Sequence, residues 1–267
     1  MLKHEMYIKR GRLGWKALPI MVSNELKALN ANRQIIYSSL LSPVLYFLFY
    51  SIGIQSTFGD IEFMGEKVSF LTYSLIGIFA MCMFRQMYQC VYRMVIDKRW
   101  GLLSLKLLNG ISPSAYILGI STFPIIGVLV QSCLLYVMAV LTGAAFPFGK
   151  FLIVLAFLVV CVLFWSACLI CIALLIKDYK QRDFVMDIVM LPILFAAPLF
   201  YSFDHAPVLI KAVSFINPLS YQVQAMRSIT FGIIDLKYIG IVILLAIVMY
   251  AFAVFCLSRT DFKNDEH

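Results

Sequence analysis

Arginine and glutamine side chains recur at helical spacing within an apolar run of this 267-residue chain. Arg85, Gln89 and Arg93 are four residues apart, so a helix stacks them on one face, with Gln86 beside them. An arginine within a membrane-spanning helix costs about 2.5–3.5 kcal/mol on insertion scales, and it normally turns toward a partner or a water-filled cavity. The stripe therefore predicts the lining of a pathway that attracts an anionic headgroup or a phosphate.

Arg85 has two alternative roles. Asp187, near the inner end of a later apolar run, is the expected counter-charge because the other carboxylates lie in predicted loops. A structural ion pair between Arg85 and Asp187 thus competes with substrate binding. Extension of the long arginine side chain to the membrane boundary is the second alternative.

The remaining reactive side chains form no catalytic or metal-binding pattern. His4, His205 and His267 stand in three separate places, and no Gly-x-x-x-x-Gly-Lys-[Ser/Thr] loop for nucleotide phosphates occurs in the sequence. The acidic residues lie mostly in predicted loops, so no carboxylate set faces another across helices. We expect a chain without catalytic or metal-binding residues. An integral membrane enzyme and a secondary transporter are the alternatives from other classes.

The elements that must carry these residues are membrane spans. Hydrophobic residues make up 62% of the sequence and charged residues 13%, and the mean hydropathy is +0.91. Apolar runs of about 17–25 residues cross a bilayer as helices. Such runs lie at residues 35–54, 70–92, 115–141, 150–176, 185–203 and 236–258. We therefore predict an all-α polytopic membrane protein with six transmembrane helices, in one membrane domain over residues 35–258.

The distribution of Lys and Arg predicts that both termini are cytoplasmic. Basic residues gather before the first span, between the second and third, and after the fourth and the last, and the opposite side holds fewer. Residues 1–34 are then a cytoplasmic N-terminal segment and residues 259–267 a cytoplasmic tail. Within the first, residues 14–34 mix apolar and charged side chains, which favours an amphipathic helix on the inner membrane surface. A solvated basic tail is the alternative.

Residues 93–112, between the second and third spans, combine charge, an aromatic anchor and a leucine-rich stretch. We expect a short helix here in which Trp100, Leu103 and Leu107 share one face. The residues expected to contact a partner are Asp97, Lys98, Arg99, Trp100, Gly101, Leu103 and Leu107. A passive loop held at the membrane interface by Trp100 is the alternative.

Residues 197–222 are apolar but contain three prolines. Broken backbone at membrane depth needs protein or water around it, so we predict two short re-entrant helices packed within the protein at the outer leaflet. Asn217 is expected to cap the second of them, with Pro218 in its first turn. Capping competes with a pathway or gate role for Asn217, Pro218 and Tyr221.

Two segments resemble the permeases of ABC type 2 exporters. Arg99-Trp100-Gly101 followed by LLSLKLLNGISPSAYILG (102–119) resembles the cytoplasmic loop of that family. NPLSYQVQAMRS (217–228) is similar to its Asn-Pro-Leu-x-Tyr segment before the last span. The loop departs from the family in having Trp100 and Ser104 where an acidic residue often stands near the glycine.

The resemblance implies the permease half of an ATP-driven exporter in the cytoplasmic membrane of a prokaryote. It implies two permease units, identical or paralogous, and two cytoplasmic ATPase subunits, with residues 93–112 as coupling helix and 197–222 as extracellular gate. This chain is expected to bind no cofactor, while ATP and Mg²⁺ bind the ATPase. Residues 32–54 look more like the branch that exports drugs, lipids or lipo-oligosaccharides. An amphipathic or lipid-linked substrate is therefore expected, and a polysaccharide or teichoic-acid exporter is the alternative.

Overall fold

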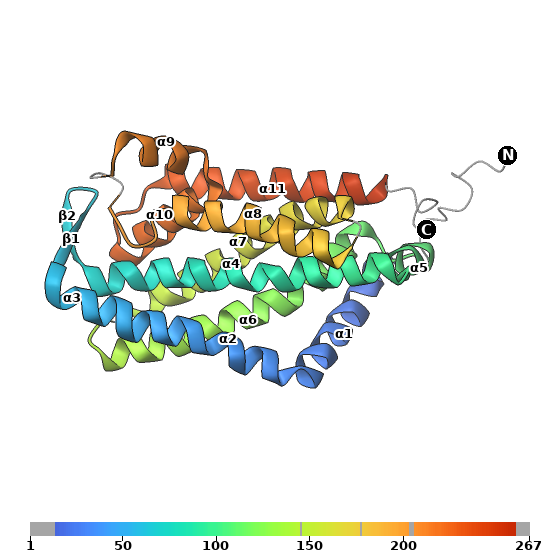
Figure 1. The fold of residues 1–267 in the computed structure, drawn as a ribbon, viewed down its shortest axis with the longest axis horizontal. Helices are drawn as coiled ribbons and strands as arrows, with labels where there is room; N and C mark the ends of the chain where they lie inside the picture. Colours follow the sequence, from blue (N-terminus) through green and yellow to red (C-terminus); the bar gives the residue numbers. More distant parts are fainter. Residues whose placement is uncertain (1–13, 145, 177, 203–205, 260–267) are drawn as a thin grey trace.

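The computed structural model describes residues 14–144, 146–176, 178–202 and 206–259, and most of them are helical (Figure 1). The first half contains η2 (Trp15–Ala17), α1 (Leu18–Ala31), α2 (Arg33–Leu45), the π-helical turn η3 (Tyr46–Ile52), α3 (Gly53–Phe58), β1 (Asp60–Phe63), β2 (Glu66–Ser69), α4 (Phe70–Arg99) and α5 (Leu102–Leu108). The second half contains α6 (Pro113–Leu141), α7 (Phe148–Leu175), α8 (Tyr179–Ala196), α9 (Val208–Ile216), α10 (Pro218–Phe231) and α11 (Leu236–Ser258). The three histidines and nearly all of the predicted tail at 259–267 lie outside the described residues.

The prediction of an all-α polytopic membrane protein is confirmed. Five helical segments of the described chain are long and apolar enough to cross a bilayer. They are Tyr37–Gln55, which runs through α2, η3 and the start of α3, and the helices α4, α6, α7 and α11.

The remaining predicted span, at residues 185–203, is not among these five segments. The helix in this region, α8, begins at Tyr179, and its first half carries four charged residues, so it is less apolar than the five segments. Its 18 residues correspond to about 27 Å of helix, close to the thickness of about 30 Å of a hydrocarbon core. The helix ends at Ala196 because Pro198 disfavours helical backbone at Ala197. α8 lies along the bundle beside α4 in Figure 1, and the six-span count depends on it.

α4 is the central helix of the bundle. Nearly all of its apolar stretch is buried, and it packs against α6, α7, α8 and α10. In contrast, Tyr37–Gln55 and α11 leave most of their apolar surface exposed within this chain, as expected of helices that face lipid or another subunit. The apolar stretch of α4 is therefore inside the protein, whereas most of that of α11 is not.

Helix boundaries follow from local capping. The Ser112 hydroxyl accepts a hydrogen bond from Ala115 N at the start of α6, and the Asp178 carboxylate accepts one from Gln181 N at the start of α8. Asn217 Oδ1 accepts from Leu219 N at 3.0 Å, and Pro218 is the first residue of α10. The predicted capping role of Asn217 is thus confirmed.

The two ends of the bundle differ in character (Figure 1). α5, α1 and the end of α11 lie at one end, while α9 and the hairpin β1–β2 lie at the other. The segment between the first two spans forms this antiparallel hairpin, with Asp60 opposite Ser69 and Phe63 opposite Glu66. Two short helices were predicted within residues 197–222, and two helices, α9 and α10, are present there, with α10 extending to Phe231.

The amphipathic segment at residues 14–34 forms η2 and α1, and α1 packs on its own chain. Its buried side chains are Met21, Glu25 and Leu29, and Met21 contacts α6 at Gly119. A Cβ at Gly119 would lie 2.5 Å from Met21 Cβ, so only glycine permits this approach. One face of α1 is therefore covered by the bundle, and the exposed face still carries apolar residues such as Ile20 and Leu26.

Candidate functional site

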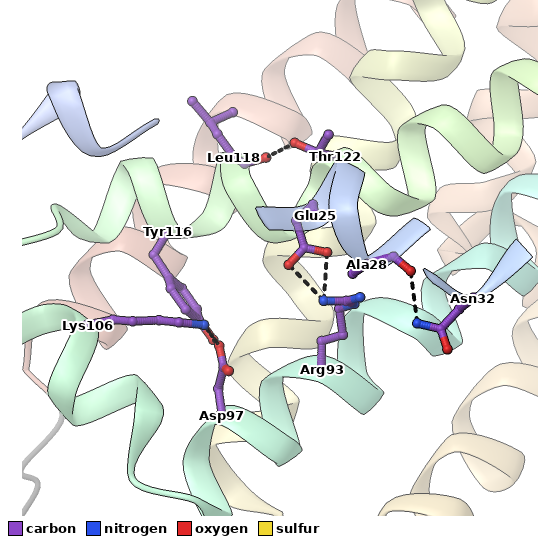
Figure 2. Close-up of polar contacts among 9 residues, drawn as sticks. All are labelled: Glu25, Ala28, Asn32, Arg93, Asp97, Lys106, Tyr116, Leu118 and Thr122. Carbon is purple, nitrogen blue, oxygen red and sulfur yellow. Dashed lines mark hydrogen bonds and ion pairs between the residues drawn. The ribbon is translucent and has the colours of Figure 1, made fainter. Parts of the chain in front are cut away.

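A polar cluster joins α4, α5 and α6 at the end of the bundle that carries α5 (Figure 2). Asp97, near the end of α4, is buried, and its Oδ2 accepts hydrogen bonds from Lys106 Nζ of α5 and, at 2.8 Å, from the Tyr116 hydroxyl of α6. The Lys106 ammonium also lies 5.5 Å from the centroid of the Tyr116 ring. This buried carboxylate therefore links the short helix to two membrane-spanning helices.

The residues predicted to form one partner-facing side are separated in the structure. Trp100 lies in the turn after α4 and is 74% exposed, whereas Leu103 on α5 is 1% exposed and Leu107 is half-buried. Gly101, at φ +65°, turns the chain between α4 and α5. The expectation that Trp100, Leu103 and Leu107 share a face is therefore wrong, because α4 continues through Arg99 and only Leu102–Leu108 forms the short helix.

Lys98 and Arg99 are held by contacts within the chain. Lys98 Nζ donates to the carbonyl oxygens of Leu174 at 2.7 Å and Ile176 at 3.2 Å, at the end of α7. The Arg99 guanidinium lies 4.6 Å from the ring centroid of Tyr179 at the start of α8. Direct contact of Asp97, Lys98 or Arg99 with a partner stays a prediction. Exposed apolar side chains at this end include Trp100, Leu102, Leu105 and Leu108.

Arg93 is paired with α1 instead of continuing the predicted polar stripe (Figure 2). Its Nη1 lies 2.9 Å from both carboxylate oxygens of Glu25, and its guanidinium lies 5.1 Å from the centroid of the Phe123 ring. Burial raises the pKa of Glu25 above its usual value, and the positive charge of Arg93 opposes this rise. The four-residue spacing grouped Arg93 with Arg85 and Gln89, but its side chain pairs with Glu25 and does not line the cavity described next.

Arg85, Gln86 and Gln89 line one cavity, in agreement with their predicted common face. The cavity has a volume of about 520 Å³ and opens between α2, η3, α4, α6 and α8. Its polar lining residues are Ser38, Ser39, Arg85, Gln86, Gln89 and Gln131. Its apolar lining includes Pro43, Tyr46, Met81, Phe84, Met190 and Leu194. The polar lining residues thus come from α2, α4 and α6 and include one cation, whereas α8 contributes only apolar side chains.

Gln131 on α6 is a cavity residue that the sequence pattern did not reveal. Its Nε2 donates to Ser39 O at 3.0 Å and to Ser39 Oγ at 2.9 Å, which ties α6 to α2. Its Oε1 is buried and accepts no hydrogen bond from any described residue. A lone glutamine in a strongly apolar run was the available signal. An acceptor of this kind suits a hydroxyl or amide N–H of a ligand, because leaving it unpaired costs about 1–3 kcal/mol.

Glycine at position 127 of α6 leaves room for the Gln86 side chain, which lines the cavity. A Cβ there would lie 2.7 Å from Gln86 Cδ, so the Gln86 side chain rests directly on the α6 backbone. Gln86 Nε2 also donates to Ser39 Oγ at 3.4 Å. Residues from three helices therefore position the amides of Gln86 and Gln131.

The expected ion pair between Arg85 and Asp187 is absent from the described part of the chain. Asp187 Oδ1 instead accepts a hydrogen bond from the Tyr88 hydroxyl at 3.2 Å. The ion pairs among the described residues join Arg93 to Glu25, Lys106 to Asp97, and Arg182 to Asp183. Arg85 is exposed at the cavity. The cation is therefore placed where a ligand can meet it.

Asn217, Pro218 and Tyr221 do not line this cavity. Asn217 Nδ2 donates to Ile193 O at 2.6 Å, which fixes the start of α10 against α8, and the Tyr221 hydroxyl donates to Phe215 O of α9 at 2.7 Å. These contacts account for the three residues as supports of the α9–α10 corner. A gate role for them stays a prediction.

Arg227 is fully buried in α10. Its guanidinium donates at 2.6 Å to the carbonyl oxygens of Pro198 and Leu199, and at 3.3 and 3.4 Å to that of Tyr73. Its Cζ lies 3.4 Å from the Tyr73 ring centroid. Among the described residues, the charge is therefore met by backbone carbonyl oxygens and an aromatic ring.

A bundle of apolar helices, a cavity lined by a cation and a short helix bound at one end are features expected of a membrane-embedded transport subunit. The sequence model of the ABC-2 type transporter family matches residues 16–231, well over half of the chain. The chain therefore belongs to the ABC-2 type transporter family. Comparison with curated proteins gives no match.

Membership of this family defines the chain as a permease subunit of an ABC transporter. Such membrane subunits work with an ABC ATPase, and typically carry no ATPase site of their own. The matched region runs from η2 to the end of α10, so it includes α5, the cavity and the α9–α10 corner.

Proposed function

We propose that this permease exports an amphipathic, anionic molecule, such as a lipid or lipid-linked compound, out of the cytoplasm of a prokaryote. The observation that carries the proposal is the position of Arg85 in a cavity with both polar and apolar lining. Arg85 lies beside the amides of Gln86 and Gln89, and α8 contributes only apolar side chains to the lining. A headgroup with negative charge fits Arg85 and the amides, and a hydrocarbon portion fits the apolar residues.

The volume of the cavity is consistent with this substrate class. About 520 Å³ falls within the range of roughly 300–1,000 Å³ typical of small-molecule sites. The unpaired Gln131 Oε1 adds a preference for a substrate that carries a hydroxyl or amide donor near its anionic group. The same lining would disfavour an organic cation, because Arg85 would repel it.

The direction of transport is inferred from charge and topology. Lys98, Arg99 and Lys106 lie at the α5 end, which supports a cytoplasmic location for that end by the positive-inside rule. The ATPase then docks at α5, and both termini are cytoplasmic. We propose an assembly of two permease chains and two ATPase chains, with ATP and Mg²⁺ bound only by the ATPase.

Transport by proteoliposomes containing the permease and its ATPase tests this function. Fluorescent phosphatidylglycerol serves as anionic probe and phosphatidylcholine with the same chains as zwitterionic probe. We expect the anionic probe to stimulate ATP turnover and to move away from the ATPase side. In Arg85→Gln, the probe concentration for half-maximal stimulation should rise about ten- to hundred-fold, because a charge-assisted hydrogen bond contributes about 1.5–3 kcal/mol.

Basal ATP turnover of Arg85→Gln should equal that of the parent protein. Arg259→Gln, which removes an exposed arginine at the end of α11, is the matched control and should leave stimulation unchanged. Equal stimulation by the two lipid probes, or an unaltered response in Arg85→Gln, would contradict the proposal. Probe movement toward the ATPase side would contradict the direction.

A further inference from the structure

A second cavity lies on a different face of the bundle, at the end that carries α9 and the hairpin. It has a volume of about 520 Å³ and is formed by α7, α10, α11 and the link between α10 and α11. Its lining is apolar except for Lys150, and it shares no residue with the cavity around Arg85. Neither the family nor the proposed transport reaction assigns a role to it.

The cavity is a groove that runs along α7. Lys150, Ile153, Phe157 and Val160 are spaced by three or four residues, so they lie on one face of the helix. From the first to the last of them the helix rises about 15 Å. Lys150 is the third residue of α7, which places it at the membrane boundary. The groove therefore extends from the interface into the hydrocarbon region, parallel to lipid chains.

Small residues leave the groove open. Ala156 contributes only a methyl group between Ile153 and Val160, and Gly232 ends α10 with φ +84°. Gly232 is required by that backbone conformation, since residues with a Cβ rarely adopt it. Ile229, Ile234 and Ile239 form the opposite wall.

The Lys150 side chain is held in place at the end of the groove where α7 begins. Its Nζ donates to Thr230 O at 3.1 Å, and a Cβ added at Gly232 would lie 2.7 Å from Nζ. The carboxylates in the described part of the chain form no ion pair with Lys150. The ammonium has two further N–H donors, so it can bind an anionic oxygen while keeping its bond to Thr230.

We propose that this groove binds one anionic phospholipid, with an acyl chain against α7 and the phosphate on Lys150. A cation at the interface followed by an apolar groove that enters the bilayer matches the polarity of such a lipid from head to tail. A helix from a second permease chain would match the apolar walls, but it would leave the ammonium without an anionic partner. The inference is independent of which substrate the permease carries.

Native mass spectrometry of the purified chain in detergent tests the site. Phosphatidylglycerol and phosphatidylcholine with the same acyl chains are added separately, and the lipids retained per chain are counted. Arg85→Gln, which removes the cation of the other cavity, is the parent chain for this experiment, and it should retain one phosphatidylglycerol at least tenfold more tightly than phosphatidylcholine. Lys150→Gln should abolish this preference, and Lys150→Arg should keep it.

Two variants complete the test. Ala156→Phe fills the groove without touching the lysine, so it should reduce retention of both lipids at the site. Lys67→Gln removes an exposed lysine of β2 at the same end and should change nothing. Equal retention of the two lipids by the parent, or unchanged retention in Ala156→Phe, would overturn the proposal. So would dissociation of a permease dimer in Ala156→Phe without a change in bound lipid.

Discussion

Glu25 and Arg93 show how a charge pair can be buried at the edge of a membrane protein. The carboxylate is nearly inaccessible, while Arg93 is partly exposed, so burial penalises mainly the negative charge. The raised pKa of Glu25 reflects this penalty, which the contact at 2.9 Å only partly offsets. The pair fixes α1 on α4 at the cost of some stability.

We expect Glu25→Gln to retain the fold, because a neutral amide of the same shape avoids the burial penalty. Glu25→Ala leaves Arg93 without its partner and should be more destabilising. The folded-state pKa of Glu25 is above the unfolded value, so the folded chain binds the proton more tightly. The contribution of Glu25 is then fully present below the unfolded pKa and is lost as pH rises through the folded pKa.

The measurement is the apparent Tm in detergent as a function of pH. The Tm of the parent protein minus that of Glu25→Gln should fall as pH rises between the unfolded and folded pKa values of Glu25. Glu66→Gln, on the exposed hairpin, should show no such trend. A difference that rises over this interval would mean that the Arg93 pairing outweighs burial.

Which polar residues share a helix face was predictable, but their partners were not. The four-residue spacing grouped Arg85 with Gln89, and both line the cavity together with the neighbouring Gln86. It could not show that Arg93 pairs with Glu25, because that contact depends on how α1 folds back on α4. Gln131 was missed for the same reason, since its role depends on Ser39 of another helix.

At the scale of elements, the segment between α8 and α9 is held by α4 and α10 together. Arg227 binds the carbonyl oxygens of Pro198 and Leu199 from one side. Gly77 of α4 approaches from the other, where a Cβ would collide with Leu199 O. The broken backbone predicted from the prolines is thus satisfied by an arginine fork inside the protein.

Arg227→Lys should loosen this segment, because a lysine cannot reproduce the two-pronged contact with Pro198 and Leu199. Each buried carbonyl left unpaired costs about 1–3 kcal/mol, so hydrogen exchange at residues 199–202 should accelerate about five- to hundred-fold. Gly77→Ala should produce the same local effect by displacing Leu199. Gly53→Ala, where an added Cβ meets nothing within 4 Å, is the control. Unchanged exchange in both test variants would rule out the clamp.

Apolar run length located the spans, whereas their ends depended on local chemistry. The runs at 70–92 and 115–141 lie within α4 (Phe70–Arg99) and α6 (Pro113–Leu141). α4 extends seven residues further, through Arg99, because its charged end packs against α7 and α8 instead of leaving the bundle. The hairpin β1–β2 gave no apolar signal, since its outward side chains are charged.

For the whole molecule, α4 connects the α5 end to the cavity. It carries Arg85, Gln86 and Gln89 in its middle and Asp97 near its end, about 12 Å of helix beyond Gln89. Asp97 is bound by Lys106 of α5 (Figure 2). A displacement of α5 by the ATPase would therefore act directly on the helix that lines the cavity.

In this arrangement, different residues dock the ATPase and transmit its movement to the cavity, so the two roles can be tested separately. Trp100 is exposed and makes no contribution to the buried cluster, so Trp100→Ala should weaken ATPase binding about tenfold or more, as loss of an aromatic anchor does, while leaving the Tm unchanged. Lys106→Gln should keep ATPase binding but lower the stimulation of ATP turnover by transported lipid, because α5 is no longer ion-paired to α4.

Co-purification of the ATPase and lipid-stimulated ATP turnover in proteoliposomes measure the two effects separately. Leu141→Ala, an exposed apolar residue at the opposite end of α6, is the control for loss of surface hydrophobicity and should match the parent in both assays. If Trp100→Ala retains parental binding, the ATPase docks elsewhere on the α5 end. If Lys106→Gln retains parental stimulation, the signal reaches the cavity without the α5–α4 ion pair, and the contacts of Lys98 with α7 become the route to examine.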